Sequence, residues 1–334
     1  MKAFILERYG KSNQMKFTDI SRPIIKPDQI LVQVHAVGLN PIDTMIPTGT
    51  FKPILKFELP AIMGSDLAGI VVEVGSKVTR FKSGDAVYAS VFDTGSGSLA
   101  EYAVVAESAA AHKPQQLDFV QAASIPMVGL TSWQAFQEHG SAINRGQKVF
   151  IPAGSGGIGT FAIQLAKYFG AIVATTTSSQ NITLVKQLGA DEVIDYKTQD
   201  FENLLHGYDF VLGAVKGDGV EKALQILKPN GKLISLVGPP DAAFARKRGM
   251  NFLMKWVFGL ISSKIIRLAK KRNIQYAFMF VHPDGQQLSK IAKLIDDGNI
   301  KPVIDQVFSF DQTLDALAYL EAGRAKGKVV VRLI

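Results

Sequence analysis

A run of glycines after an apolar strand is the feature of this sequence best suited to bind a nucleotide. Residues 148–159 read Lys-Val-Phe-Ile-Pro-Ala-Gly-Ser-Gly-Gly-Ile-Gly, a pattern that predicts a buried strand, a turn and the start of a helix. The glycines have the G-x-G-x-x-G spacing, which permits a tight bend, close approach of a pyrophosphate to the backbone, and close packing of helix on strand. We expect a dinucleotide at the helix N-terminus, held by Gly154, Ser155, Gly156, Gly157, Ile158 and Gly159.

The segment that follows bears on which dinucleotide binds. A helix is predicted over Ile158–Phe169, ended by Gly170, and a second strand over Ala171–Thr175. Proteins that prefer NAD place an Asp or Glu at the end of this strand to hold the ribose 2′-hydroxyl. Here residues 176–181 are hydroxyl and amide side chains, and the next acid is Asp191. These donors favour NADPH (NADP+) over NADH, although the same residues also suit an ordinary polar loop without Arg or Lys.

Two domains are expected from the length of 334 residues and from a change of pattern along the chain. Before about residue 117 short strands alternate with Gly and Pro, as at 30–37, 68–74 and 85–91, which is typical of a small β-barrel. From about residue 118 strands and helices alternate, which predicts a doubly wound parallel sheet in an α/β protein. The candidate strands of this sheet span 148–152, 171–175, 192–195, 209–212 and 232–237.

The expected domain boundaries follow from these patterns. The barrel domain covers 1–120 and is completed by about 283–334, where a helix, a strand, a helix and a strand are predicted at 285–296, 303–308, 311–322 and 328–333. The nucleotide-binding domain covers 121–282. The chain contains no cysteine, which excludes disulfides, thiolate zinc sites and a cysteine nucleophile. The apolar run at the start is too short for a signal peptide, so a cytoplasmic protein is expected.

The net charge of +8 is concentrated in one segment. Nine basic residues and no acid lie between Ala242 and Pro283, and the rest of the chain is close to neutral, so no nucleic-acid partner is expected. The same segment is rich in apolar residues, and we predict one or two basic amphipathic helices over about 242–275. A helical cover, packed through Trp256, Phe258, Ile265 and Leu268 or at a dimer interface, is favoured over peripheral contact with a membrane.

Several further motifs, taken with the glycine turn, resemble one known family. They are Leu39-Asn40-Pro41-Ile42-Asp43, Gly64-Ser65-Asp66-Leu67-Ala68-Gly69, Phe81-Lys82-Ser83-Gly84-Asp85, Leu99-Ala100-Glu101-Tyr102, Leu188-Gly189-Ala190-Asp191 and Ala325-Lys326-Gly327-Lys328. In this order and spacing they resemble the medium-chain dehydrogenase/reductase superfamily, in its zinc-free quinone oxidoreductase branch. The resemblance implies a GroES-like catalytic barrel, an inserted Rossmann domain, a cofactor cleft between the two, and a homodimer.

The residues also bear on whether a catalytic zinc is present. Zinc-dependent members of the superfamily use a Cys, a Gly-His-Glu and a later Cys or acid as ligands, and here the second of these is Gly64-Ser65-Asp66. Without cysteine a thiolate site cannot form, and no metal is expected. Without a Lewis acid to polarise an alcohol, reduction of a conjugated acceptor fits better than alcohol oxidation.

The resemblance also implies roles for individual residues. Asn40 and Asp43 are expected beside the nicotinamide, with Thr44 where many relatives have a tyrosine, although Asn40 and Asp43 also suit a turn cap. The implied cofactor contacts, apart from the glycine turn, are Thr131, Thr177, Ser178, Asn181, Tyr196, Gly238, Phe280 and Lys328. Phe278 and Phe280 would equally suit a core. Asn181 stands where a lysine often binds the 2′-phosphate, so Lys186, Lys197 or Lys328 would supply the positive charge instead. Gly213 stands where an aspartate is common.

The expected function is therefore an NADPH-dependent, zinc-free reductase of a small lipophilic quinone or of an α,β-unsaturated carbonyl. Hydride would reach the acceptor from the cofactor, and the proton would come from solvent. Two alternatives stay open. One is an enoyl-thioester reductase of the same superfamily, and the other is a non-catalytic NADPH-binding accessory or sensor protein that docks through residues 242–275.

Overall fold

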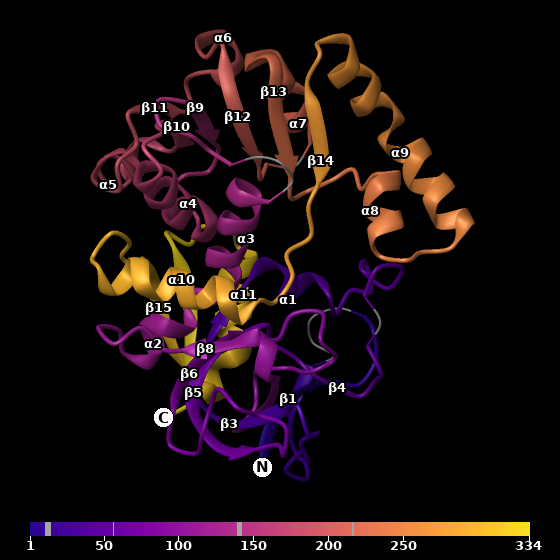
Figure 1. The fold of residues 1–334 in the computed structure, drawn as a ribbon, viewed down its shortest axis with the longest axis vertical. Helices are drawn as coiled ribbons and strands as arrows, with labels where there is room; N and C mark the ends of the chain where they lie inside the picture. The colour runs from indigo at the N-terminus through magenta and orange to yellow at the C-terminus, as the bar shows by residue number, and fades with distance from the viewer. Residues whose placement is uncertain (11–14, 56, 139–141, 216) are drawn as a thin grey trace. The chain divides into compact units, whose positions relative to one another are not determined.

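The computed structural model describes residues 1–10, 15–55, 57–138, 142–215 and 217–334, and these form two compact units (Figure 1). The first unit contains Met1–Leu130 and His282–Ile334, and the second contains Thr131–Val281. The expected α/β class, a GroES-like barrel with a Rossmann sheet, is confirmed. Each unit has its own buried core and is described separately below.

The second unit is built on a parallel sheet whose strand order is β11-β10-β9-β12-β13-β14. The chain enters at the centre and moves outward first in one direction and then in the other, which is the order of a dinucleotide-binding sheet. The strands are β9 Lys148–Ile151, β10 Ile172–Thr177, β11 Glu192–Asp195, β12 Tyr208–Gly213, β13 Leu227–Ser235 and β14 Gln275–Phe278. β14, which lies at the end of the basic segment, was not expected from the sequence.

Helices connect these strands and bury the faces of the sheet. They are α4 Gly157–Tyr168, α5 Ile182–Gln187, α6 Phe201–Leu204, α7 Gly219–Ile226, α8 Ala242–Lys247 and α9 Phe252–Lys271, while α3, Pro126–Gln137, contains the boundary between the units. Phe161 and Leu165, and likewise Ala162 and Ala166, are four residues apart, and all four are buried on α4. The helix ends before Gly170, whose φ of +80° is the left-handed conformation that glycine adopts freely.

The first unit is a mostly antiparallel assembly around one long strand, β3 Gln29–Leu39, with a parallel pair between β15 and β16. β3 pairs with β5, β7 and β16, and it thereby links residues from both ends of the chain. The other strands are β1 Lys2–Leu6, β2 Met15–Asp19, β4 Ala61–Ile62, β5 Asp66–Val74, β6 Ala86–Ser90, β7 Tyr102–Ala106, β8 Ala110–His112, β15 Ile304–Ser309 and β16 Lys328–Arg332. The main helices are α1 Pro41–Met45, α2 Phe119–Ala123, α10 Gly285–Asp296 and α11 Thr313–Glu321.

The basic segment forms two helices, α8 and α9, and not a continuous helical stretch to residue 275. The chain leaves α9 at Arg272 and enters β14, because Ile274 and Phe278 are buried in the second unit. Phe258 and Ile265 are buried as expected of a helical cover, but the expectation for Trp256 is wrong, since 56% of it is exposed. Among the described residues, no helix is long and apolar enough to span a membrane.

Candidate active site

The glycine turn is tied to the strand beside it. The N–H of Gly154 donates to the carbonyl of Thr176 at 2.9 Å, and the N–H of Ala153 donates to Thr176 Oγ1 at 3.1 Å. A Cβ on Gly154 would lie 2.1 Å from Thr175 Oγ1, and a Cβ on Gly159 would lie 2.4 Å from the Ala153 carbonyl. These two glycines are therefore required by the packing of turn, strand and helix.

Gly156 differs from Gly154 and Gly159 because the space that a side chain would occupy there is nearly open. A Cβ there would have one contact, with the Ala153 carbonyl at 3.3 Å. Gly156 is the N-cap of α4, a helix of 12 residues, and the residues from Ser155 to Ile158 are partly exposed. The first N–H groups of a helix have no partner within it and attract anions. An open backbone at this helix end fits a pyrophosphate.

Polar side chains gather next to the turn at the end of β10. Thr177 Oγ1 lies 2.9 Å from Ser155 Oγ, and Asn181 Nδ2 lies 3.2 Å from Ser155 Oγ and 3.3 Å from Ser178 Oγ. The structure thus brings together four residues that the sequence placed at the cofactor. It corrects one boundary, because β10 continues to Thr177 where a loop was expected from residue 176. Three consecutive threonines are buried there, and β-branched residues suit a strand.

The acids near this cluster face other partners. Asp191 lies at the other end of β10, where its carboxylate accepts from the Val173 N–H at 2.7 Å and pairs with Lys167 at 2.8 Å. Asp195 is opposite Thr177 in the β10–β11 register, a position that the sequence did not reveal, and its Oδ1 accepts from the Lys197 N–H. Tyr196 donates its N–H to the Thr177 carbonyl, and 61% of Tyr196 is exposed.

The remaining predicted cofactor residues of the second unit lie in several places. Thr131 is buried. Gly238 has a φ of +97°, and its carbonyl accepts from Ser235 Oγ at 2.8 Å. The Phe280 ring lies 5.6 Å from the Arg248 guanidinium and 5.9 Å from the Phe244 ring, an aromatic group that also contains Phe278. Their contacts with a cofactor stay predictions.

The first unit holds a buried polar cluster that joins three strand ends. Asn40 follows β3, Ser65 and Asp66 stand at the start of β5, and Lys328 begins β16, while Asp43 lies on α1. All five are less than 5% exposed. Since Val329 pairs with Leu39, the pairing of β16 with β3 brings Lys328 beside Asn40. The cluster therefore depends on contacts between distant parts of the chain.

A lysine and an aspartate face each other in this cluster. The Lys328 ammonium donates to Asn40 Oδ1 at 2.5 Å and lies 3.8 Å from Asp66 Oδ2. Asp66 Oδ2 also accepts from Asn40 Nδ2 at 2.9 Å and from the Met127 N–H at 3.0 Å. Burial raises the pKa of Asp66 and lowers the pKa of Lys328, while the attraction between them opposes both shifts. Lys328, expected at a phosphate or between domains, here holds Asn40 and Asp66.

Removal of one partner of this buried pair is expected to destabilise the protein strongly. In Lys328→Met the Asp66 carboxylate keeps its burial but loses its cation, which should lower the free energy of unfolding by about 3 kcal/mol or more. Chemical denaturation at neutral pH measures this. Adding Asp66→Asn to Lys328→Met should recover much of the loss, because the unpaired charge is then removed. A double variant as unstable as the single one would contradict the pairing.

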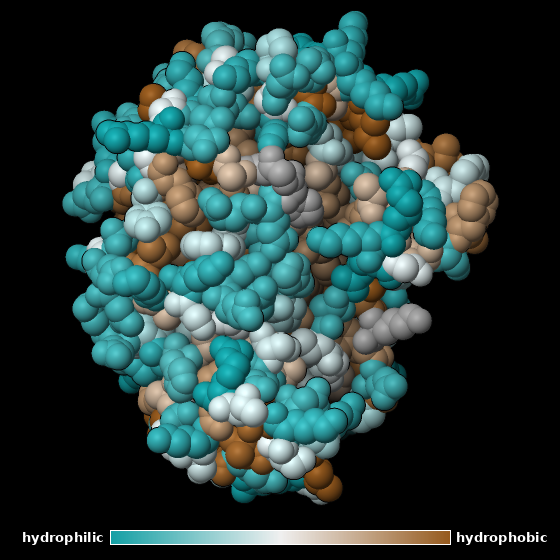
Figure 2. Space-filling view, in the orientation of Figure 1, coloured by the Kyte–Doolittle hydropathy of each residue, from teal (hydrophilic) through white to brown (hydrophobic). Residues whose placement is uncertain are grey.

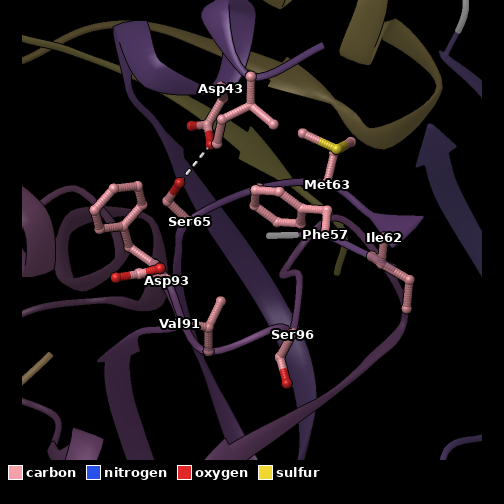
Figure 3. Close-up of a pocket in the computed structure, with 11 residues that line it drawn as sticks. Asp43, Phe57, Ile62, Met63, Ser65, Val91, Asp93 and Ser96 are labelled. Carbon is pink, nitrogen blue, oxygen red and sulfur yellow. Dashed lines mark hydrogen bonds between the residues drawn. The ribbon is translucent and has the colours of Figure 1, made fainter. Parts of the chain in front are cut away.

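Asp43 is a buried carboxyl beside a small pocket (Figure 3). The Ser65 hydroxyl donates to Asp43 Oδ1 at 2.5 Å, and the Asn40 N–H donates to Asp43 Oδ2 at 2.8 Å. Burial, the largest cause, raises the pKa of Asp43 to about 7, and the repulsion of Asp66 adds to it, while the two hydrogen bonds and Lys328 lower it. Asp43 therefore holds and releases a proton near neutral pH.

The pocket is mostly apolar, with the Asp43–Ser65 pair on its wall. Figure 3 shows that pair facing each other, with Phe57, Met63 and Val91 around the same space. The lining is completed by Ile46, Ile62, Gly64, Phe92, Asp93 and Ser96. Thr44, the third predicted catalytic residue, is not part of the lining; its hydroxyl donates to the Pro41 carbonyl at 2.9 Å, and it is 9% exposed.

Ser65 and Asp66 were not expected as site residues from the sequence. The available signal was their position in Gly64-Ser65-Asp66, where zinc-dependent relatives have metal ligands. The donors present do not suit zinc, because Ser65 donates to Asp43 and Asp66 faces the Lys328 ammonium. In the described part of the chain, no group of three or more His, Cys, Asp or Glu side chains is arranged to hold a metal ion.

Comparison with known proteins identifies the family of the chain. Residues 26–115 match the family described as alcohol dehydrogenase GroES-like domain, and residues 188–331 match the one described as zinc-binding dehydrogenase. The chain is 35% identical to "NAD(P)H oxidoreductase RTN4IP1, mitochondrial" of Danio rerio, covering 100% of this chain and 92% of the relative. It is 36% identical to "NADPH-dependent alkenal/one oxidoreductase, chloroplastic" of Arabidopsis thaliana, covering 99% of this chain and 79% of the relative.

The fold has a close counterpart among solved structures. The quinone oxidoreductase of Coxiella burnetii superposes with a TM-score of 0.85 at 30% identity, covering 100% of this chain and 99% of the other. The two relatives named above are organellar by name, and this overturns the expectation of a cytoplasmic protein, which rested on the weak apolar run at the start of the chain. The chain belongs to the medium-chain dehydrogenase/reductase superfamily, in its zinc-free quinone oxidoreductase-like branch, and is an oxidoreductase of that family.

Proposed function

We propose that this oxidoreductase uses NADPH to reduce a quinone or an α,β-unsaturated carbonyl compound without a metal ion. The observation that carries the proposal is the open backbone at Gly156, next to a cluster of hydroxyl and amide groups. The same site would hold the pyrophosphate on α4 and the adenosine ribose beside β10.

Individual residues of the second unit have defined parts in this proposal. Ser155, Gly156, Gly157 and Ile158 would hold the pyrophosphate with their backbone, and Gly154 and Gly159 permit the turn. Thr177, Ser178 and Asn181 would accept a ribose 2′-phosphate, and Tyr196 offers an exposed ring to the adenine. Thr131 is a proposed contact to the cofactor ribose or phosphate, and Gly238 and Phe280 are proposed contacts toward the nicotinamide. The Arabidopsis relative, whose name states dependence on NADPH, supports the choice of cofactor.

The cofactor preference is testable by titration. We expect NADPH to bind at least about tenfold more tightly than NADH, a difference of about 1.4 kcal/mol. The reason is that the end of β10 presents Thr177, Ser178 and Asn181, and Asp195 is engaged by the Lys197 N–H. Nicotinamide fluorescence measures both dissociation constants. Ser178→Asp is the matched control, because a carboxylate placed there should repel the 2′-phosphate and reverse the order. Equal affinities in the wild-type protein would contradict the assignment.

The pocket beside Asp43 is too small for a whole quinone or enone, so we propose that only the oxygen end of the acceptor approaches Asp43 there. Its wall is apolar except for Asp43, Ser65, Asp93 and Ser96. NADPH, when bound, would supply the hydride, and negative charge would develop on the acceptor oxygen. We propose that the Asp43 carboxyl, which is close to half protonated near neutral pH, delivers the proton through or beside the Ser65 hydroxyl. Solvent then returns that proton to Asp43.

Asn40 and Thr44 act on this proton donor indirectly. Asn40 fixes Asp43 through its N–H and is itself held by Lys328 and Asp66. Thr44 bonds to the Pro41 carbonyl and supports the short helix that carries Asp43. We propose both as positioning residues of the site.

The acceptor class is tested by following NADPH oxidation with quinones, enones and enoyl thioesters, in buffer that contains EDTA. Turnover of quinones or enones that survives EDTA is the expected result. A preference for enoyl thioesters would instead identify an acyl-thioester reductase, and tight NADPH binding with no turnover of any acceptor would identify an accessory or sensor protein. Loss of activity on metal removal would contradict the metal-free mechanism.

A further inference from the structure

Helix α9 has two faces of different character. Phe258, Ser262, Ile265 and Ala269 recur at intervals of three and four residues and are all buried, and Ile265 and Ala269 belong to the core cluster of the second unit. This face also contacts α7 and β14. The opposite face is therefore free to interact with something other than the sheet.

That opposite face carries large apolar side chains in its N-terminal half. Their exposed fractions are 82% for Phe252, 62% for Leu253, 56% for Trp256, 53% for Leu260 and 55% for Ile261. At 3.6 residues per turn, Phe252, Trp256 and Leu260 form one continuous stripe. Figure 2 shows brown atoms at the right-hand edge of the molecule, where Figure 1 draws α9. Exposed apolar patches of this kind mark interaction surfaces.

The same stripe becomes basic in the C-terminal half of the helix. Arg267, Lys270 and Lys271 continue it and are exposed, and Lys264 beside them is 70% exposed although it contacts Glu221 at 2.7 Å. No acidic residue occurs between Ala242 and Pro283. One helix face therefore joins a Trp-containing apolar region to a cationic region, which is the composition of helices that lie in a membrane interface.

We propose that α9 docks the protein on the surface of a membrane rich in anionic lipids. Phe252, Trp256 and Leu260 would enter the boundary between headgroups and acyl chains, while Arg267, Lys270 and Lys271 contact lipid phosphates. The buried face stays on the sheet, so docking requires no unfolding of the second unit. Such docking would place the enzyme where lipophilic acceptors concentrate, and it rests on observations independent of the proposed activity.

Charge argues for this partner over a second copy of the chain. A symmetric contact of α9 with itself would bring together two copies of the same surface. Nine basic residues and no acid in each copy of the segment would then repel one another. An anionic membrane is complementary to both halves of the helix face.

Vesicle sedimentation with the full-length protein tests the proposal. We expect binding to phosphatidylcholine vesicles that contain phosphatidylglycerol and little binding to phosphatidylcholine alone, with affinity falling as salt rises. Arg267, Lys270 and Lys271 replaced together by Gln should weaken binding roughly 100-fold, at about 1 kcal/mol per charge. In the matched control, Gln replaces Lys26, Lys77 and Lys82 of the first unit, which are also exposed. This variant should bind the anionic vesicles as tightly as the wild-type protein.

Trp256 provides a second readout. The chain contains two tryptophans, and Trp133→Phe leaves Trp256 as the reporter. Its emission should shift to the blue on anionic vesicles and be quenched by brominated lipid, and Trp256→Gln should weaken binding without lowering the melting temperature. The proposal would be overturned if the lysine control lost vesicle binding as strongly as the α9 variant, or if brominated lipid did not quench Trp256. It would also be overturned if the protein bound no vesicles and Trp256→Gln instead dissociated a dimer. NADPH affinity, measured in parallel, tests the proposed function separately.

Discussion

Gly156→Val is expected to abolish NADPH binding while leaving the fold intact. The added side chain would meet one atom of the protein, the Ala153 carbonyl at 3.3 Å from Cβ, and otherwise projects into the space proposed for the pyrophosphate. The Gly156 backbone has φ −81° and ψ 173°, which valine adopts readily. Affinity should fall at least about 100-fold, or roughly 3 kcal/mol. Titration with NADPH and thermal unfolding of the apo protein measure the two effects.

The neighbouring glycines supply the matched control. A methyl group on Gly154 or Gly159 would lie within 2.4 Å of protein atoms, so Gly154→Ala and Gly159→Ala should lower the melting temperature before any ligand is added. These results would separate the three glycines into one that serves the ligand and two that serve packing. Normal NADPH affinity in Gly156→Val, at wild-type stability, would refute the binding site.

Asp43→Asn is expected to lower kcat by about 100-fold with little effect on cofactor binding, because the acceptor loses its proton donor. If Asp43 donates the proton, its protonated form is the active one, so kcat of the wild-type enzyme should fall as pH rises through about 7, and this decrease should be absent from Asp43→Asn. Asp66 and Lys328 also face this carboxyl. Ser65→Ala is a second variant of the same site: it removes a hydrogen bond that lowers the pKa of Asp43, so the decrease in kcat should move to higher pH.

Asp43→Asn should also increase the free energy of unfolding above neutral pH. The pKa of Asp43 is raised from 3.8 to about 7, so the folded state binds the proton more tightly and stability falls as pH rises between these values. The full shift of about three pKa units corresponds to about 4 kcal/mol. Asp43→Asn should therefore unfold at a higher denaturant concentration than wild type at pH above 7, and show little such gain below pH 4. A variant less stable than wild type at high pH would contradict the buried, shifted carboxyl.

Local sequence patterns predicted most of the second unit. The glycine turn, the helix after it and β11 were predicted from residues close together in the chain, because spacing and apolar periodicity act over a few residues. β14 was missed because it follows directly on the amphipathic helix, and its four residues have no distinct alternation. The end of β10 was missed because threonines suit both a polar loop and a strand.

The buried cluster of the first unit was less predictable. Ser65 reaches Asp43 across 22 residues, and Lys328 reaches Asn40 across 288, so only the pairing of β3 with β5 and β16 brings these groups together. Periodicity also indicated that α9 is amphipathic but not which apolar residues meet the sheet. The buried stripe runs through Phe258 and Ile265, which leaves Trp256 on the exposed side.

The proposed function depends on direct transfer of hydride from NADPH to a conjugated acceptor without a metal ion. One experiment tests this transfer: the purified enzyme reduces an enone with stereospecifically deuterated NADPH in buffer that contains EDTA, and the product is examined by NMR. We expect one deuterium at the β-carbon of the product, from one face of the nicotinamide, and a solvent-derived proton at the α-carbon. Label absent from the product, or consumption of NADPH that requires an added metal ion, would rule out this transfer.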